Sequence, residues 1–198
     1  MARGDKSSKI IEAASKVFYL AGFDGTKMEE IAKEAGIGKG TVYEYFDSKQ
    51  HLFDEMVKYK INERISIVKE LMEVEGTLRD KIFKMVKYQI EFMKNHINIF
   101  NVMKSSSQIA QKPEMGLMIF EHNLKVFDIV KEQLTKAQEM EEISRTTNVD
   151  VAAGLIIGTI NQFCMKQIIH FGIIPKEKDM QEVVDAIFYG IAVQDNRT

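Results

Sequence analysis

The segment from residue 23 to residue 53, FDGTKMEEIAKEAGIGKGTVYEYFDSKQHLF, constrains the fold of this chain more than any other part. Met28, Ile31 and Ala35 recur at helical spacing. Gly36 ends that run, because glycine readily adopts the left-handed conformation that closes a helix. Val42 and Phe46 then indicate the inward face of a second short helix. Two short helices joined at a glycine corner predict a helix-turn-helix, a motif with which proteins read the major groove of DNA.

Polar residues indicate where these helices begin. Thr26 and Glu29 have the spacing of a capping box, in which a hydroxyl and a carboxylate satisfy backbone amides at a helix start. Asp47 or Ser48 is expected to cap a third helix, with Lys49 in its first turn. A lysine there, beside unpaired backbone amides, suits a phosphate group.

The charge of this region does not by itself favour nucleic acid. Residues 1–50 carry eight lysines and arginines and eight aspartates and glutamates, so they are neutral overall. A basic composition is the usual footprint of a DNA-binding domain. The prediction therefore depends on position: Lys39 and Lys49 flank the second short helix. We expect each copy of this N-terminal region, here called the head, to bind DNA with modest affinity, and a dimer to supply the remaining affinity.

The string I-A-x-x-A-G-I-G-K-G-T-V-Y-x-Y-F-x-S-K-x-x-L-F resembles the N-terminal domain of the TetR family of bacterial transcriptional regulators. The preceding residues 10–14 (IIEAA), with Phe18 and Gly22, also match that family's first helix and its exit. The resemblance covers about the first 55 residues. Beyond them, only the length and an all-helical pattern match.

The resemblance implies roles for nine residues at the DNA. Thr26 and its helix N-terminus, Tyr43, Tyr45 and Lys49 meet the sugar-phosphate backbone, and Lys39, Gly40 and Thr41 start the recognition helix nearest the groove. Tyr43 has an alternative place, packed under the first helix. Glu44 either accepts a hydrogen bond from a cytosine amine or points to solvent. The complete predicted DNA-binding set is Thr26, Lys27, Gly38, Lys39, Gly40, Thr41, Tyr43, Tyr45 and Lys49.

The remaining sequence predicts an all-α fold of about nine helices. The 198 residues contain only 2 prolines, and apolar residues recur at helical spacing, as from Ser48 to Gly76, from Thr77 to Asn95 and from residue 97 to about residue 107. Thr77 and Asp80 have the spacing of another capping box. We expect an N-terminal three-helix domain at residues 1–50 and a larger helical domain for effector binding and dimerisation at residues 51–198. No signal peptide or membrane span is recognisable, which predicts a cytoplasmic protein.

The stretch from residue 149 to residue 171 is apolar on nearly all sides, so it is expected to be covered on every face. Gly154 and Gly158 would let another helix approach closely. The family resemblance implies the same, because TetR-like proteins dimerise through their last two helices. The predicted dimer contacts are Leu155, Gly158, Phe163, Val184, Ile187 and Phe188.

The chain contains 12 methionines, and most of them, with many phenylalanines, lie in the larger domain and give it an adaptable interior. The plainer interpretation of each methionine is core filling. The resemblance implies a pocket between the central helices for a small lipophilic effector. Its predicted lining is Gln89, Met93, His96, Met103, Met118, Asn123, Phe127, Gln162 and Met165.

No catalytic or metal-binding pattern supports an enzyme, and no cofactor or metal is expected. Cys164 is expected to be a small buried hydrophobe. The leading hypothesis is a dimeric, ligand-responsive regulator, a repressor that binds a pseudo-palindromic operator and is released by its effector. The alternatives are a helical small-molecule carrier without specific DNA binding, and an activator of the same fold.

Overall fold

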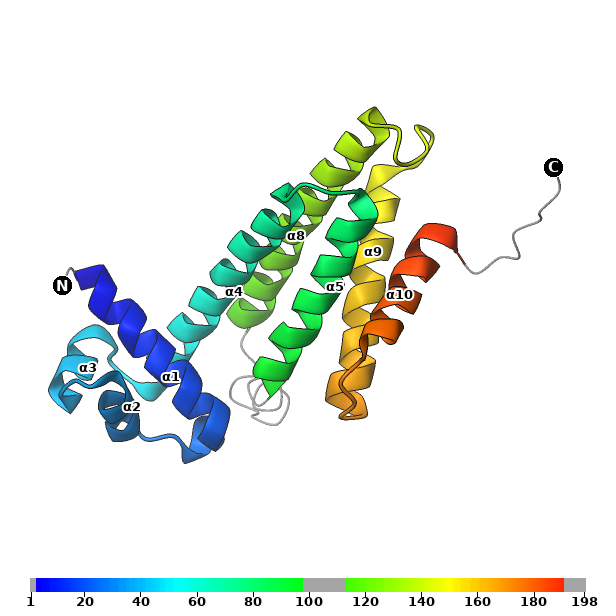
Figure 1. The fold of residues 1–198 in the computed structure, drawn as a ribbon. Helices are drawn as coiled ribbons and strands as arrows, with labels where there is room; N and C mark the ends of the chain where they lie inside the picture. The colour runs from blue at the N-terminus through cyan, green and yellow to red at the C-terminus, as the bar shows by residue number, and fades with distance from the viewer. Residues whose placement is uncertain (1–2, 98–112, 191–198) are drawn as a thin grey trace, which may run out of the picture. The chain divides into compact units, whose positions relative to one another are not determined.

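The computed structural model describes residues 3–97 and 113–190, and its regular secondary structure there is helical throughout (Figure 1). The expected all-α fold is confirmed. The helix expected at residues 97–107 lies, after its first residue, outside the described residues. In chain order the helices are α1 (Arg3–Gly25), α2 (Met28–Ala35), α3 (Lys39–Tyr45), α4 (Lys49–Glu73), α5 (Leu78–Asn95), α8 (Pro113–Glu139), α9 (Val149–Cys164), the π-helical segment η1 (Met165–His170) and α10 (Glu177–Tyr189).

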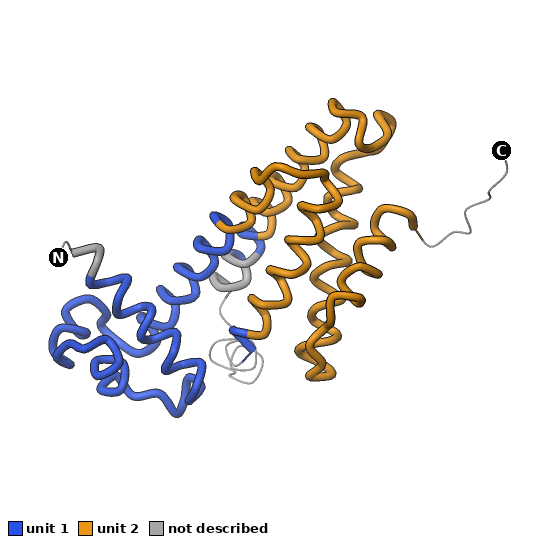
Figure 2. The backbone as a smooth tube through the Cα atoms, in the orientation of Figure 1, with its two compact units in different colours: residues 1–66, 95–122 blue, residues 67–94, 123–198 orange. Residues whose placement is uncertain are grey.

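The chain forms two compact units, coloured separately in Figure 2. The first contains residues 1–66 and 95–122, and the second contains residues 67–94 and 123–198. Helix α4 runs without interruption from one unit into the other. The boundary at residue 50 stays a prediction, and the first core continues beyond that position through Leu52, Phe53, Met56 and Val57.

The core of the first unit joins α1, α2, α3 and the start of α4. Ile10, Phe18, Ile31, Val42 and Phe53 are each at most 1% exposed. The Phe53 ring meets the Phe18 and Phe23 rings edge-on, at centroid distances of 5.2 and 5.3 Å. These edge-to-face contacts suit the quadrupoles of the rings. They pack the start of α4 against the last turns of α1.

The helix starts of the first unit differ in detail from the expected capping boxes. The N-cap of α2 is Lys27, one residue later than expected, and the Lys27 amide donates to the Glu30 carboxylate at 3.2 Å. The predicted Thr26–Glu29 box is therefore wrong by one position. At α4 the structure selects Ser48 of the two candidates, because the His51 amide donates to Ser48 Oγ at 3.0 Å.

In the second unit, α5 begins as its sequence predicts. Thr77 and Asp80 form a reciprocal capping box, with the Thr77 amide donating to Asp80 Oδ2 at 3.2 Å and the Asp80 amide donating to Thr77 Oγ1 at 3.2 Å. The buried stripe then follows the apolar spacing along the helix. Its members are Leu78, Ile82, Met85, Val86, Gln89, Ile90 and Met93.

Within a single chain, helix α9 is covered on one side only, and coverage of its other side by a second copy stays a prediction. Ala153, Ile156, Ile160 and Cys164 are buried, at spacings of three and four residues. The opposite side is exposed at Val151, Leu155, Gly158, Gln162 and Met165. The helix then widens into η1, where the Phe171 amide donates to the carbonyl of Lys166, five residues back, at 3.1 Å. An apolar stripe on α9 thus faces away from the core of its own unit.

No helix in the described ranges is long and apolar enough to cross a lipid bilayer. Within those same ranges, no group of three or more histidine, cysteine, aspartate or glutamate side chains is arranged to hold a metal ion. Cys164 is fully buried, as expected of a small hydrophobe.

Candidate nucleic-acid interface and ligand cavity

The turn between α2 and α3 is built on Gly36. Its φ of 64° and ψ of 38° lie in the left-handed region, where a side chain is unfavourable. The Gly36 amide donates to Lys33 O at 3.1 Å and the Ile37 amide donates to Ala32 O at 3.0 Å. The last carbonyls of α2 are therefore satisfied inside the turn. With Ala32 and Ala35 almost fully buried, α3 is held close against α2.

Helix α3 presents most of its surface to solvent. Of its seven residues only Val42 is buried. Lys39, Gly40, Tyr43 and Glu44 are exposed, and Thr41 and Tyr45 are half-buried. Tyr43 is 42% exposed, so it does not pack out of sight under α1, and Glu44 points to solvent. The predicted recognition residues that belong to α3 are thus available together on one short helix.

Of the two glycines at the start of α3, Gly38 is the N-cap, where glycine is favoured, whereas Gly40 lies inside the helix and has no internal reason to be glycine. A methyl group added at Gly38 or at Gly40 would meet nothing within 4 Å, and neither residue has a positive φ. Glycine in a helix destabilises it relative to alanine, by about 0.5–1 kcal/mol. The absence of a side chain here leaves the helix start open to close approach from outside.

Lys39 is tied to Glu29 of α2. Its ammonium donates to Glu29 Oε1, and Lys39 Nζ lies 5.8 Å from the centroid of the Tyr43 ring. The Lys39 hydrogen bond lowers the pKa of the Glu29 carboxyl, and the same bond raises the pKa of the Lys39 ammonium. The cation of the recognition helix is therefore paired within the protein. Sequence reasoning assigned Glu29 to a capping box with Thr26 and did not pair it with Lys39, because a contact across the turn has no fixed local spacing.

Thr26 lies inside the head and not on its surface. The residue is 2% exposed, and its hydroxyl donates to the carbonyl of Gly22 at 2.6 Å. Gly22 is the point at which α1 departs from helical geometry. The Thr26 hydroxyl thus closes the end of α1, which differs from the phosphate contact expected from the sequence. Lys27, beside it, is exposed.

Lys49 also has internal partners. Its ammonium donates to the carbonyl oxygens of Phe23 at 2.7 Å, Thr26 at 3.0 Å and Asp24 at 3.3 Å. The same nitrogen lies 4.6 Å from the centroid of the Phe23 ring. An ammonium has three N–H donors, and three carbonyls occupy them. Lys49 therefore connects the α1–α2 turn to the first turn of α4, where a phosphate contact was expected.

A buried polar pair lies elsewhere in the first unit. Arg64 Nη1 lies 2.7 Å from His122 Nε2, and both residues are less than a tenth exposed. Because a guanidinium only donates, His122 Nε2 accepts and its ring proton is on Nδ1. His122 is thus part of the interior of this unit.

The predicted dimer residues divide between surface and interior. Leu155 is 64% exposed and Gly158 is exposed, while Phe163, Ile187 and Phe188 are half-buried. Val184 is fully buried in its own unit, so it is not available to a partner and is removed from the predicted contacts. Other exposed apolar residues of the second unit include Val151, Phe171, Ile173 and Ile174.

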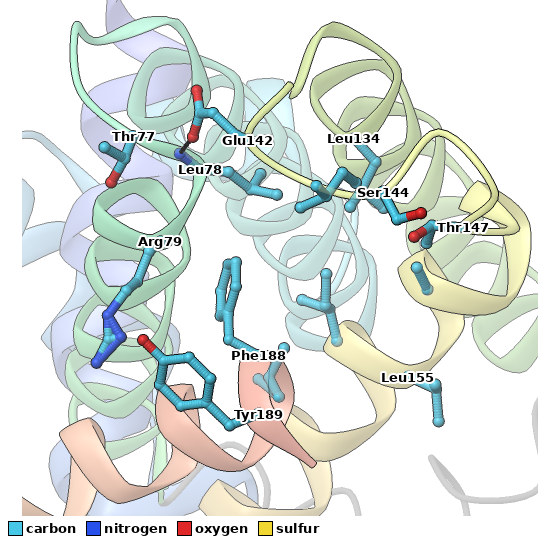
Figure 3. Close-up of a pocket in the computed structure, with 14 residues that line it drawn as sticks. Thr77, Leu78, Arg79, Leu134, Glu142, Ser144, Thr147, Leu155, Phe188 and Tyr189 are labelled. Atoms are coloured by element: carbon cyan, nitrogen blue, oxygen red, sulfur yellow. Dashed lines mark hydrogen bonds between the residues drawn. The ribbon is translucent and has the colours of Figure 1, made fainter. Parts of the chain in front are cut away.

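A cavity of about 730 Å³ lies in the second unit, among the start of α5, the end of α8, the loop that follows it, α9 and α10 (Figure 3). Its apolar lining includes Leu78, Leu134, Leu155, Ile156 and Phe188. Arg79 and Tyr189 lie together on one side of it, and Ser144 and Thr147 lie on the other side. An apolar hollow of this size with a few convergent polar groups is typical of a small-molecule site.

Arg79 is the cation of this cavity. It pairs with Asp185 of α10, 106 residues further along the chain, and its guanidinium carbon lies 5.6 Å from the centroid of the Tyr189 ring. Arg79 Nη1 is buried and has no hydrogen-bond partner within the described part of the chain. In the same cavity, Glu142 Oε2 accepts a hydrogen bond from the Leu78 amide at 2.6 Å. Within the described part of the chain, Arg79 thus lines the cavity and keeps one buried donor that no protein group accepts.

None of the seven predicted pocket residues whose side chains the structure describes lines this cavity. Gln89 and Met93 are buried on α5, His96 and Phe127 are half-buried, and Asn123, Gln162 and Met165 are exposed. Met103 and the side chain of Met118 lie outside what the structure describes. Three predicted dimer residues, Leu155, Ile187 and Phe188, line it instead. Sequence reasoning missed Arg79 and Tyr189, because only the folded chain brings α5 and α10 together.

Comparisons with known proteins agree with this architecture. A family model described as "Bacterial regulatory proteins, tetR family" matches residues 10–56. The chain is 31% identical over 106 residues to the HTH-type transcriptional regulator YhgD of Bacillus subtilis, a match that covers 54% of this chain and 56% of that protein. The chain thus spans just over half the length of that relative. It is 25% identical over 162 residues to the fatty acid metabolism regulator protein of B. subtilis, covering 79% of this chain and 80% of that protein.

Among solved structures, the transcriptional regulator FadR of B. subtilis in complex with stearoyl-CoA superposes with a TM-score of 0.72 at 22% identity. The superposition covers 93% of this chain and 99% of that one. At 22% identity, this similarity shows that the two chains share a fold. The helix-turn-helix, the family match and the relatives together show that residues 10–56 form an N-terminal domain of the tetR family of bacterial regulatory proteins.

Proposed function

We propose that this protein is a DNA-binding transcriptional regulator whose first unit reads an operator and whose second unit binds an effector. The exposed face of α3 is the observation that carries the DNA-binding proposal. It combines a lysine, two tyrosines and a threonine with Gly40, a glycine that nothing inside the chain requires. Such a helix start can come close to base edges in a major groove.

In this proposal the contacts divide by location. Lys39, Gly40 and Thr41 meet the groove, and Lys27, Gly38, Tyr43 and Tyr45 meet the backbone of the duplex. Thr26 and Lys49 shape the head from inside, since their polar atoms are engaged with backbone carbonyls. Phosphate contacts then position the head, and base contacts specify the sequence.

The exposed apolar stripe of α9 supports a homodimer. Val151, Leu155, Gly158 and Met165 share one side of the helix, and a large exposed apolar surface is typical of a protein contact. Two heads related by a two-fold axis would recognise a pseudo-palindromic operator. The expected place of action is the cytoplasm, where such an operator is accessible.

The cavity of the second unit supports an effector with an apolar body and an acidic or carbonyl end. Its apolar lining suits a hydrocarbon chain, and the unused Nη1 donor of Arg79 suits an oxygen acceptor. FadR of B. subtilis, which shares the fold, was solved in complex with stearoyl-CoA. A fatty acid or a fatty-acyl thioester is therefore the first ligand class to examine.

The DNA-binding proposal is tested by selection of bound duplexes from a random pool with the purified chain, at two salt concentrations. An enriched pseudo-palindrome, with affinity that falls steeply with salt, is the expected result. A folded protein that enriches no sequence would instead support the alternative of a helical carrier. Reporter transcription from the selected operator then separates repression from activation.

The effector proposal is tested by calorimetric titration with fatty acids and fatty-acyl thioesters of increasing chain length. Arg79→Leu should weaken binding by about tenfold or more, because a charge-assisted hydrogen bond is lost. Arg145→Leu is the matched control, since Arg145 is exposed, pairs with Glu141 and does not line the cavity. Equal affinities of the two variants would contradict the assignment of the cavity.

A regulatory effect requires coupling between the two sites. An effector that prefers a conformation unsuited to the operator lowers DNA affinity, commonly by about 1–3 kcal/mol, and DNA lowers effector affinity by the same factor. Operator affinity measured with and without saturating effector gives this quantity directly.

A further inference from the structure

Glu29 and Lys39 meet across the turn between α2 and α3, on the outer surface of the head. Their side chains are 57% and 51% exposed, and Lys39 Nζ lies above the Tyr43 ring. The ion pair therefore lies among the residues proposed to face DNA. A carboxylate there is unfavourable beside phosphates unless it has a partner, and Lys39 supplies that partner.

We propose that Glu29 is a specificity-determining residue, which neutralises Lys39 so that this lysine reads a base and does not serve as a phosphate anchor. The inference rests on the proposed DNA-binding function and names a residue that the proposal above did not use. It concerns how the head divides its interactions between sequence-independent and sequence-dependent contacts.

The charges of the head support this role. Lys39 is the one cation within α3, and the exposed Glu44 is its one anion, so pairing with Glu29 leaves this helix with no excess positive charge. Lys49 has its three donors engaged with carbonyls, and Lys16 of α1 pairs with Glu34 at 3.0 Å. The head is neutral overall. Sequence-independent attraction comes from lysine and arginine contacts to phosphates. In this head it therefore depends on the cations that stay exposed, such as Lys27.

The geometry leaves Lys39 able to donate elsewhere. An ammonium has three donors, and Glu29 accepts from one of them. The other two can reach an acceptor such as guanine O6 or N7 while the charge stays compensated. Without Glu29, the flexible lysine is free to turn toward a phosphate, which exerts a stronger attraction than a neutral base edge.

The consequence for binding has a defined sign. Glu29→Gln should add one phosphate contact per head, which steepens the slope of log affinity against log salt by about 0.9 per head. Between 0.05 and 0.2 M salt this corresponds to an additional decrease of about 3.5-fold per head. Affinity for random duplex should rise at low salt, and the ratio of operator to random-duplex affinity should fall.

The closest control is Glu34→Gln. Glu34 lies on the same helix, is exposed and pairs with a lysine of another helix, so its replacement changes the net charge by the same amount away from α3. Exposed ion pairs contribute little to folding, so both variants should keep the fold. A third variant, Lys39→Met, and its combination with Glu29→Gln show whether Glu29 acts through Lys39.

The experiment measures the affinity of the full chain for its selected operator and for random duplex at a series of salt concentrations. The expected result is a steeper slope and a lower specificity ratio for Glu29→Gln, with wild-type values for Glu34→Gln and no effect of Glu29→Gln when Lys39 is Met. Equal slopes for wild type and Glu29→Gln would overturn the inference. So would an effect that persists in the Lys39→Met background, or one that Glu34→Gln reproduces.

The wild-type measurements separate this inference from the proposed function. If the wild-type chain selects no operator, the DNA-binding function itself fails. If it selects an operator and the Glu29 variants behave as wild type, only the role of Glu29 fails.

Discussion

At the scale of single residues, the head uses several polar side chains internally that look available in the sequence. The Thr26 hydroxyl closes α1 at Gly22, and the Lys49 ammonium collects three carbonyls from the turn that follows. Both residues lie next to backbone that leaves a helix, where carbonyl groups lack helical partners. A polar residue near a predicted DNA surface can therefore serve the fold that presents the surface.

Replacement of Lys49 separates these two roles. Lys49→Ala should lower the free energy of unfolding by about 1–3 kcal/mol, because carbonyls of the α1–α2 turn lose a charged donor. The salt slope of DNA binding should stay as in wild type. Urea denaturation and salt-dependent binding measure the two quantities, with the exposed Lys33→Ala as the control. Unchanged stability of Lys49→Ala, with a slope of log affinity against log salt that is flatter by about one unit, would instead support a phosphate contact for Lys49.

We expect replacement of Gly40 to raise the stability of the fold and to lower the affinity for the operator. Gly40→Ala should raise the free energy of unfolding by about 0.5–1 kcal/mol, since the added methyl meets nothing within 4 Å and alanine favours the helix. Operator affinity should fall, because the same methyl separates α3 from the base edges. Thermal unfolding of the variant used for binding excludes loss of fold. Unchanged operator affinity would mean that α3 does not approach DNA at this position.

At the scale of helices, the sequence predicted what local rules decide. The corner at Gly36, the Thr77–Asp80 box and the buried stripe of α5 follow from a left-handed glycine, a cap spacing and a helical period. The Thr26 box failed by one residue, because helix starts shift easily between neighbouring caps. The sequence cannot choose between such caps without the packing around them.

These local rules could not predict contacts between segments that are far apart in the sequence. Arg79 meets Asp185 and Tyr189 only because α5 and α10 both border the cavity, and no spacing in the sequence relates them. Helix α9 shows the same limit. Its apolar composition predicted a covered helix, whereas only the folded unit reveals that Ala153, Ile156 and Ile160 face inward and Leu155 does not.

At the scale of the whole molecule, the exposed apolar side of α9 is the surface through which the proposed homodimer would form. A stripe with Val151 at one end and Met165 at the other is long enough to cover most of the helix, and it continues to exposed apolar residues at Phe171, Ile173 and Ile174. Burial of such a surface in a symmetric pair would place two reading heads on one operator.

A charge on this stripe should separate the copies. Leu155→Glu should raise the dimer dissociation constant by at least about 100-fold, because it places an unpaired carboxylate in an apolar contact. The monomer should keep its fold, since Leu155 is already 64% exposed. Sedimentation velocity measures the association state, and Met140→Glu, at an exposed position outside α9, is the control. A dimer of wild-type strength would place the interface elsewhere.

The unbroken course of α4 sets a rule for building chimaeras within the family. A recombinant protein joined at residue 50 would supply Leu52, Phe53 and Met56 from a different parent than the rest of the hydrophobic cluster to which they belong. The edge-on stacking of Phe53 on Phe18 and Phe23 would then depend on chance complementarity between parents. A joint placed after Ile61, within the same helix and with its register kept, would take the cluster, and the Tyr59 and Ile61 side chains that pack against it, from one parent. The proposed DNA preference should then be transferred with them.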